Sequence, residues 1–267
     1  MALRSQMLRR RPRGIPLRAV IPNAITALAL CSGLSGVRFA TVGDWDRAVM
    51  MIVIAGVLDG LDGRVARMLR GESRFGAELD SLADAISFGV SPALVLFLWS
   101  LTQWPRLGWI AALMLAVFCA LRLARFNAQI DADEQPHKSA GFLTGVPAPA
   151  GAGLAMLPLI TWLWSGEPIL RSPWLVAPWV AFVAILMISS VATYSWTSFR
   201  LRRTVRFEAI AAAVVLAAAL VTAPWQTLTV ISALYLLTIP FSMVSYAKIR
   251  RLRASAPATP TEQSPSA

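Results

Sequence analysis

The feature that most constrains this chain is a series of apolar runs, each about as long as a helix that crosses a membrane. A spanning helix needs about 20 mostly apolar residues, and the 267-residue sequence contains eight such runs. Hydrophobic residues make up 57% of the chain and charged residues 15%, whereas soluble domains contain about 45–50% and about 25%. We therefore predict an all-α integral membrane protein with about eight transmembrane helices. The expected spans are residues 20–41, 47–70, 77–101, 107–127, 147–165, 173–196, 207–223 and 226–247.

The basic residues predict an orientation in the membrane. Lys and Arg are enriched in the cytoplasmic loops of membrane proteins. If the N-terminus is cytoplasmic and eight helices follow, all but four of the 25 basic residues lie on the cytoplasmic side. The exceptions are Arg38, Arg47, Arg106 and Arg171. We expect a multi-pass protein of a bacterial inner membrane with both termini in the cytoplasm, and this distribution accounts for most of the net charge of +11 without nucleic acid.

Four aspartates stand where charge is least expected, at the end of the second run and the start of the third. Placing a charged residue deep in a membrane helix costs at least about 2.5–3.5 kcal/mol of free energy. We therefore expect a functional or structural role for Asp59, Asp62, Asp80 and Asp84. At about 100° per residue, they lie on one face of each of two antiparallel helices. The first face holds Asp59, Asp62, Gly63, Ala66 and Arg67, and the second holds Gly76, Asp80, Ala83, Asp84, Ser87 and Ser91. Both faces can look into one cavity near the cytoplasmic surface.

Carboxylates gathered in this way indicate a site for divalent metal. Four negative charges in one cavity repel one another, and two divalent ions would balance them. Oxygen ligands suit Mg²⁺, Mn²⁺ or Ca²⁺, and a two-metal site can clamp the attacking and leaving oxygens at phosphorus. The alternative is structural, with the aspartates pairing with nearby arginines at a wet helix end.

Small residues and one arginine lie on the same faces as the aspartates. Gly63, Ala66 and Gly76 would let the two helices approach closely and leave room for a flat, polar ligand. Arg67 lies one turn after Gly63, and its planar guanidinium suits a phosphate.

The spacing of these residues resembles the signature of the CDP-alcohol phosphotransferase family. It reads Asp59-x2-Asp62-Gly63-x2-Ala66-Arg67-x8-Gly76-x3-Asp80-x3-Asp84, eight fixed residues over 26 positions. The resemblance implies a membrane enzyme that cleaves the pyrophosphate of a CDP-alcohol, transfers the substituted phosphate to an alcohol and releases CMP. It implies that Asp59, Asp62 and Asp80 bind two metal ions, and that Asp84 is a ligand and the general base. Asp59, Asp62, Gly63, Ala66, Arg67 and Gly76 would contact the CDP-lipid.

Flanking stretches are similar to those of family members that use CDP-diacylglycerol as donor and L-serine as acceptor. They are residues 22–26, 80–92, 122–127 and 142–149. This resemblance implies Mn²⁺ or Mg²⁺ as cofactor, with Ca²⁺ as a further possibility, and a homodimer among membrane lipids. Arg122 and Arg125 would hold the serine carboxylate or a lipid phosphate; the alternative for both is ordinary anchoring at the cytoplasmic face.

Other functions stay open at this point. The acceptor could be glycerol phosphate, inositol phosphate or choline within the same family. A cation transporter with intramembrane carboxylates is a different class, although the sequence has no internal repeat and its acids cluster toward one face. A structural adaptor would not need four acids at one cavity. His137, the one histidine, is interpreted as a solvated loop residue.

The chain is expected to divide into three parts. Residues 1–19 would form a basic interfacial segment, 20–250 the membrane catalytic domain, and 251–267, rich in Pro, Ser, Thr and Ala, a disordered cytoplasmic tail. The first apolar run is interpreted as a transmembrane helix rather than a signal peptide. Cys31 and Cys119 lie inside apolar runs and are interpreted as small buried hydrophobic residues.

Overall fold

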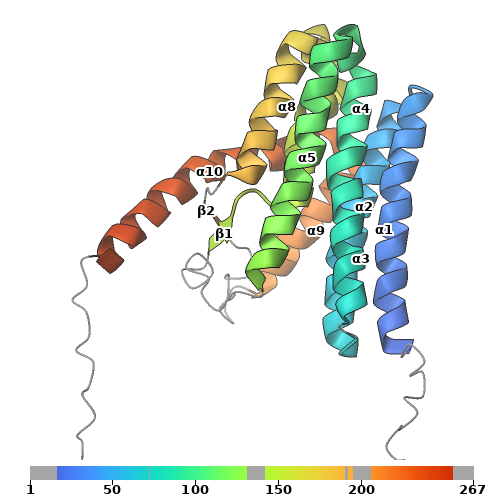
Figure 1. Cartoon of the computed structure of the whole chain (residues 1–267). Coiled ribbons are helices and arrows are strands. Elements are labelled where there is room, and N and C mark those ends of the chain that lie inside the picture. Colours follow the sequence, from blue (N-terminus) through green and yellow to red (C-terminus); the bar gives the residue numbers. More distant parts are fainter. Residues whose placement is uncertain (1–16, 72, 131–141, 190–191, 195–205, 255–267) are drawn as a thin grey trace, which may run out of the picture.

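The computed structural model describes residues 17–71, 73–130, 142–189, 192–194 and 206–254, and confirms the all-α prediction (Figure 1). The main helices are α1 (Leu17–Thr41), α2 (Trp45–Leu69), α3 (Arg74–Asp84), α4 (Ser91–Trp99), α5 (Pro105–Ile130), α6 (Ala148–Ala155), α7 (Leu157–Ser165), α8 (Pro173–Ile188), α9 (Arg206–Thr222) and α10 (Pro224–Ala254). Short helical turns are η1 (Ala85–Val90), η2 (Leu101–Gln103) and η4 (Pro168–Arg171). The three-part division stays a prediction, and residues 1–16, His137 and residues 255–267 lie outside the described part.

Each expected span overlaps one or more helices, but the sixth, residues 173–196, is not helical throughout, because α8 ends at Ile188 and residues 192–194 form a strand. The number of membrane crossings stays a prediction. Among the described residues, four helical segments are long and apolar enough to cross a membrane: Val20–Thr41, Arg74–Trp99, Pro105–Ala128 and Pro224–Ser242. Pro173–Ile188 and Ala211–Thr222 are apolar but shorter.

Capping residues set the turns on both sides of α2. At its start, the Asp44 carboxylate accepts a hydrogen bond from the Arg47 amide at 3.2 Å, as an N-cap residue does. At its end, Arg70 adopts the left-handed conformation (φ 49°) that closes many helices. Ser73 then caps α3 by accepting from the Gly76 amide at 3.0 Å. The end of α2 and the start of α3 are therefore each capped on either side of the short connection between them.

The third expected span is not one regular α-helix, because residues 85–90 form a π-helix between α3 and α4. Its wider turn changes the helical register after Asp84. Ser87 packs against α1, where a Cβ on Gly33 would lie 2.7 Å from the Ser87 hydroxyl. Only glycine leaves space for this approach.

The fifth expected span is also interrupted, at Met156 between α6 and α7. Pro158 has no amide hydrogen, so the helix cannot make its usual bond to the carbonyl four residues earlier. That carbonyl, of Leu154, accepts a hydrogen bond from the Trp179 indole at 2.8 Å. The indole of α8 therefore satisfies the group that the proline leaves without a helical partner.

The core lies where α4, α5, α6 and α8 meet, and fully buried Leu96, Leu115, Ala152 and Val180 belong to it. Beside it, β1 (Phe142–Thr144) and β2 (Ala192–Tyr194) form a short antiparallel ladder with Phe142 opposite Tyr194. In Figure 1, α1 to α5 run roughly side by side, while α10 leaves the bundle obliquely.

The two cysteines have different environments. Cys119 on α5 is buried as expected, whereas Cys31 is exposed, so that prediction was wrong. Cys31 lies on the face of α1 that also exposes Leu28 and Leu34, pointing away from the bundle.

Candidate active site

Three of the four aspartates come together between α2 and α3. One carboxylate oxygen from each of Asp59, Asp62 and Asp80 lies within 4.8 Å of the others. Calcium and magnesium bind oxygen at about 2.0–2.6 Å, so ligands on opposite sides of such an ion are about 4–5 Å apart. The spacing of the three carboxylates, which we call the carboxylate cluster, therefore fits a divalent cation.

Asp84 lies next to this cluster. Its carboxyl group is close enough to that of Asp59 to interact electrostatically, but it is not one of the three that converge. Asp84 is the last residue of α3, directly before the π-helix. The backbone irregularity thus begins at the carboxylate for which the sequence predicts the role of base.

The structural alternative, pairing with arginines, is not what the structure has. In the described ranges, the salt bridge between side chains joins Arg47 to Asp44 at 3.1 Å, near the start of α2 and far from the cluster. None of the four aspartates has an arginine or lysine nitrogen within 4.0 Å in this part of the chain. Acidic groups gathered without cationic partners are a suitable donor set for a metal ion.

A pocket of about 320 Å³ opens beside the cluster. Six of its lining residues are ones that the sequence predicted for the site: Asp62, Gly63, Ala66, Arg67, Gly76 and Asp80. The other six are Pro22, Asn23, Thr26, Gly71, Ser73 and Ala77. The first helix, α1, thus forms a third wall, which the sequence analysis did not predict. Its only signal in the sequence was the Pro22-Asn23-x2-Thr26 stretch.

Thr26 connects this third wall to the cluster. Its hydroxyl donates to Asp62 Oδ2 at 2.6 Å, and both side chains are almost fully buried, at 5% and 4% exposure. On the opposite side, Asn127 of α5 donates to the Ser81 hydroxyl of α3 at 2.9 Å. The helix that carries Asp80 and Asp84 is therefore also tied to α5.

The small residues were predicted both to let α2 and α3 approach closely and to leave room for a ligand, and the structure separates these two roles. A Cβ added to Gly63 would meet nothing within 4 Å, so this glycine leaves the pocket open rather than bringing two backbones together. A Cβ on Gly76 would lie 2.8 Å from Asn23 Oδ1. The close approach is therefore between α3 and α1, not between α3 and α2.

The two arginines of α5 have different surroundings. Arg125 donates to the carbonyls of Ile188 and Ser189, at 2.8 and 3.2 Å, and so binds the C-terminal end of α8. Arg122 is close enough to Asp84 to interact electrostatically. Its Nε atom is buried and makes no hydrogen bond to the described residues. Of the two, Arg122 is the one that interacts with a carboxylate of the site.

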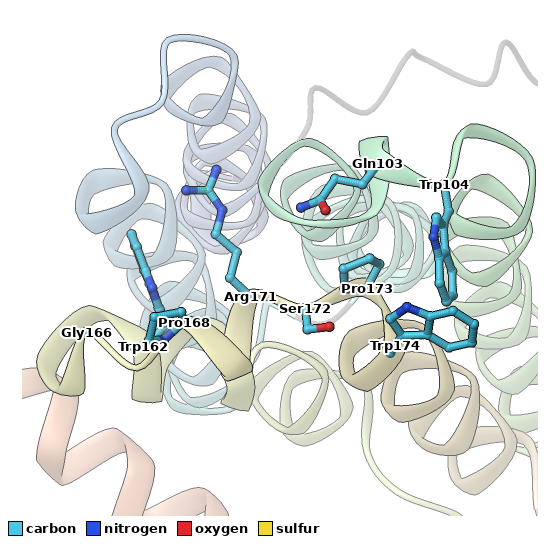
Figure 2. Close-up of a pocket in the computed structure, with 9 residues that line it drawn as sticks. All are labelled: Gln103, Trp104, Trp162, Gly166, Pro168, Arg171, Ser172, Pro173 and Trp174. Atoms are coloured by element: carbon cyan, nitrogen blue, oxygen red, sulfur yellow. The ribbon is translucent and has the colours of Figure 1, made fainter.

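A second cavity, of about 520 Å³, lies at the opposite end of the bundle (Figure 2). Arg171 and Trp162 are on one side of it, and Gln103, Trp104 and Trp174 are on the other. The Arg171 Nε donates to the Trp99 carbonyl at 2.9 Å, and the guanidinium lies 5.8 and 5.5 Å from the ring centres of Trp45 and Trp162. No acidic residue is among its described lining residues. We call this the tryptophan cavity.

Comparison with known proteins agrees with the carboxylate site. Residues 19–194 match the family model described as CDP-alcohol phosphatidyltransferase, and residues 205–240 match a second model, CDP-alcohol phosphatidyltransferase 2. Relatives named CDP-diacylglycerol–serine O-phosphatidyltransferase are similar along much of the chain. The Mycobacterium bovis protein is 41% identical over 234 residues, which cover 87% of this chain and 81% of the relative.

Two further relatives with the same name extend the comparison. The Mycobacterium leprae protein is 41% identical over 84% of this chain and 74% of the relative. The Helicobacter pylori 26695 protein is 37% identical over 52% of this chain and 56% of its own length. The first family match alone spans well over half of the sequence. The chain therefore belongs to the CDP-alcohol phosphatidyltransferase family, which its aspartate spacing predicted under the name CDP-alcohol phosphotransferase.

Proposed function

We propose that this protein transfers a phosphatidyl group from CDP-diacylglycerol to L-serine, forming phosphatidylserine and CMP. The observation that carries the proposal is the carboxylate cluster, which opens on a pocket lined by residues of the family signature. Relatives 41% identical over most of the chain bear the name of this activity. Their names also support serine rather than glycerol phosphate, inositol phosphate or choline as the acceptor.

Divalent metal is part of the proposal. Asp59, Asp62 and Asp80 would hold Mn²⁺ or Mg²⁺, with Asp84 completing a site for two ions; Ca²⁺ would suit the same oxygen donors. The bound ions would stabilise negative charge on the pyrophosphate oxygens. These oxygen ligands make no salt bridge to a cation in the described part of the chain, which supports this assignment.

The remaining pocket residues would bind the CDP group. Arg67 would contact a phosphate through its planar guanidinium, while Gly63, Ala66 and Gly76 leave the space that the flat nucleotide requires. All four line the pocket of about 320 Å³, which is within the size range of small-molecule sites.

In the proposed reaction, the serine hydroxyl oxygen attacks the lipid-side phosphorus. A new bond forms between this oxygen and phosphorus, and the bond from phosphorus to the bridging oxygen breaks. The Asp84 carboxylate accepts the hydroxyl proton as general base, and CMP leaves with the bridging oxygen. Arg122, adjacent to Asp84, would hold the serine carboxylate or a lipid phosphate. Arg125 would contribute only donors that its bonds to α8 leave available.

The membrane arrangement completes the proposal. We expect a multi-pass protein of a bacterial inner membrane with the carboxylate pocket on the cytoplasmic side. Most Lys and Arg residues lie in the segments that this orientation places in the cytoplasm, as is usual for membrane proteins. The acyl chains of the donor would stay in the inner leaflet. The expectation of a homodimer comes from the family resemblance and stays a prediction.

The test uses the full-length protein in detergent with CDP-diacylglycerol, Mn²⁺ or Mg²⁺, and one acceptor at a time. We expect CMP release that requires both L-serine and metal, and phosphatidylserine as the lipid product. Release with another alcohol instead would support the family chemistry but would contradict the assignment of L-serine as the acceptor. If folded, metal-binding protein released no CMP with any of the acceptors, uptake of divalent cation into vesicles would be measured next, and uptake would support a transporter.

A further inference from the structure

A threonine outside the aspartate signature holds one of the cluster carboxylates. Thr26 of α1 and Asp62 of α2 are 36 positions apart in the sequence, yet the hydroxyl oxygen lies 2.6 Å from Asp62 Oδ2. This is the length expected when a hydroxyl donates to a charged carboxylate. Burial of both groups excludes most competing water, which makes the bond stronger than an exposed one.

The hydroxyl has a second neighbour, but it can serve only one acceptor at a time. The Pro22 carbonyl, one turn earlier on α1, lies 3.1 Å from the same oxygen. A hydroxyl carries one proton, and the shorter contact to the charged acceptor is the more favourable of the two. Bonds of the i−4 kind are common in the described helices, and the one from Ser35 to the Cys31 carbonyl at 2.7 Å stays within α1. Thr26 differs from Ser35 because its hydroxyl also reaches another helix.

The bond restricts the Asp62 carboxylate. Threonine is branched at Cβ and has few rotamers in a helix, so its hydroxyl occupies a nearly fixed place on α1. The carboxylate cannot rotate about its terminal bond without losing this donor. In the described part of the chain, Asp62 is the one carboxylate of the cluster that accepts from a hydroxyl.

We propose that Thr26 is a positioning residue that orients Asp62 for divalent cation binding, and that α1 is thereby a functional part of the metal site. This inference rests on the proposed function, which supplies the metal. The Asn23 side chain, one turn before Thr26, packs against Gly76 of α3. Thus α1 contacts both helices that carry the cluster: Thr26 bonds to Asp62 of α2, and Asn23 packs against Gly76 of α3. Groups that orient metal ligands typically contribute about 10–100-fold to metal affinity.

The experiment measures Mn²⁺ binding directly, by the electron paramagnetic resonance signal of free Mn²⁺, on full-length protein in detergent without substrate. Thr26→Val keeps the shape and removes the hydroxyl, Thr26→Ser keeps the hydroxyl, and Ser35→Ala removes a hydroxyl of α1 that bonds only within its helix. We expect Thr26→Val to raise the Mn²⁺ dissociation constant about 10–100-fold, with Thr26→Ser and Ser35→Ala near the wild type. CMP release by Thr26→Val should be recovered when Mn²⁺ is raised.

Each other outcome counts against the inference in a distinct way. Unchanged Mn²⁺ affinity in folded Thr26→Val would overturn it, and so would equal losses in Thr26→Val and Thr26→Ser, which would indicate packing rather than hydrogen bonding. Wild-type protein that binds no Mn²⁺ would overturn the metal assignment of the proposed function as well. Thermal unfolding and size-exclusion profiles identify variants that fail to fold. Thr26→Ala is the second hydroxyl-free variant if Thr26→Val is among them.

Discussion

Charged side chains have opposite surroundings at the two ends of the helix bundle. At one end, three carboxyl groups converge with Asp84 next to them, and none of the four has an arginine or lysine nitrogen within 4.0 Å among the described residues. At the other, the Arg171 charge is held by the Trp99 carbonyl and two indole rings (Figure 2). The tryptophan cavity is larger, about 520 Å³ against about 320 Å³. The better indication of a reactive site is therefore a group of like charges that make no salt bridge, not the size of a cavity.

The two ends also differ in their aromatic residues, because the tryptophan cavity has several tryptophans in its lining. Tryptophans are favoured at membrane interfaces, where one part of the ring is apolar and the other is wet. In the tryptophan cavity they also pack on one another, as the Trp104 and Trp174 rings do at 4.2 Å. Such contacts stabilise the junction of α4, α5, α7 and α8. Among the described residues, no pair of aromatic rings packs together at the carboxylate end, which is consistent with a site that a ligand completes.

The largest effect is expected at the proposed base. Asp84→Asn removes the proton acceptor while keeping size, so the rate of CMP release should fall about 10²–10⁴-fold, with binding of CDP-diacylglycerol largely retained. Asp46→Asn is the matched control, because Asp46 is exposed in the first turn of α2 at the other end and should have no effect. Turnover near wild type in Asp84→Asn would show that another group takes the proton.

A smaller effect is expected at the proposed phosphate contact. Arg67→Lys keeps the charge but loses the planar guanidinium. Hydrogen bonds to charged groups contribute about 1.5–3 kcal/mol, so the KM for CDP-diacylglycerol should rise at least about tenfold. Arg64→Lys, on the same helix but outside the pocket lining, should leave KM unchanged. Equal KM values in the two variants would show that the Arg67 guanidinium does not bind CDP-diacylglycerol.

The contact between α1 and α3 can be tested by adding one methyl group. Gly76→Ala would place a Cβ 2.8 Å from Asn23 Oδ1, and overpacking of this kind costs about 1–3 kcal/mol. The melting temperature should fall, and Asn23→Ala in the same chain should restore part of it. Gly60→Ala is the control, since a Cβ there meets nothing within 4 Å. If Gly76→Ala melted like Gly60→Ala, the third wall of the site would not be as close as described.

The smallest effect on activity is expected in the tryptophan cavity. Arg171→Met removes one hydrogen bond and two cation–π contacts, so it should destabilise the protein by about 1–2 kcal/mol. Serine-dependent CMP release by the folded variant should be unchanged. Thermal unfolding and initial rates, measured on the same preparation, separate the two. A loss of rate without a loss of stability would mean that this end takes part in function.

Much of the carboxylate site could be predicted because it depends on local geometry. Asp59 and Asp62 share a face through helical periodicity, and the capped turn at Ser73 brings Asp80 back to the same end. The expectation that these three approach one another needed only two adjacent helices. The predicted roles of the individual residues, including Asp84, stay predictions.

What the sequence did not reveal depends on contacts between distant helices. The bond from Thr26 to Asp62 requires α1 to pack beside α2, and periodicity within either helix does not specify this. The π-helix after Asp84 is accompanied by the tight packing of Ser87 on Gly33. Arg125 donates to the carbonyl of Ile188 at the end of α8, and these two residues are 63 positions apart in the sequence. The interruption before α7, by contrast, had a local signal in Pro158.

The most direct test of the central claim compares the two ends in one assay. Serine-dependent CMP release from CDP-diacylglycerol would be measured as Mn²⁺ is titrated, for the wild type, Asp80→Asn and Arg171→Met. The account predicts metal-dependent release by the wild type and by Arg171→Met, and loss of release in Asp80→Asn at every Mn²⁺ concentration. Release that survived in folded Asp80→Asn and disappeared in folded Arg171→Met would contradict it.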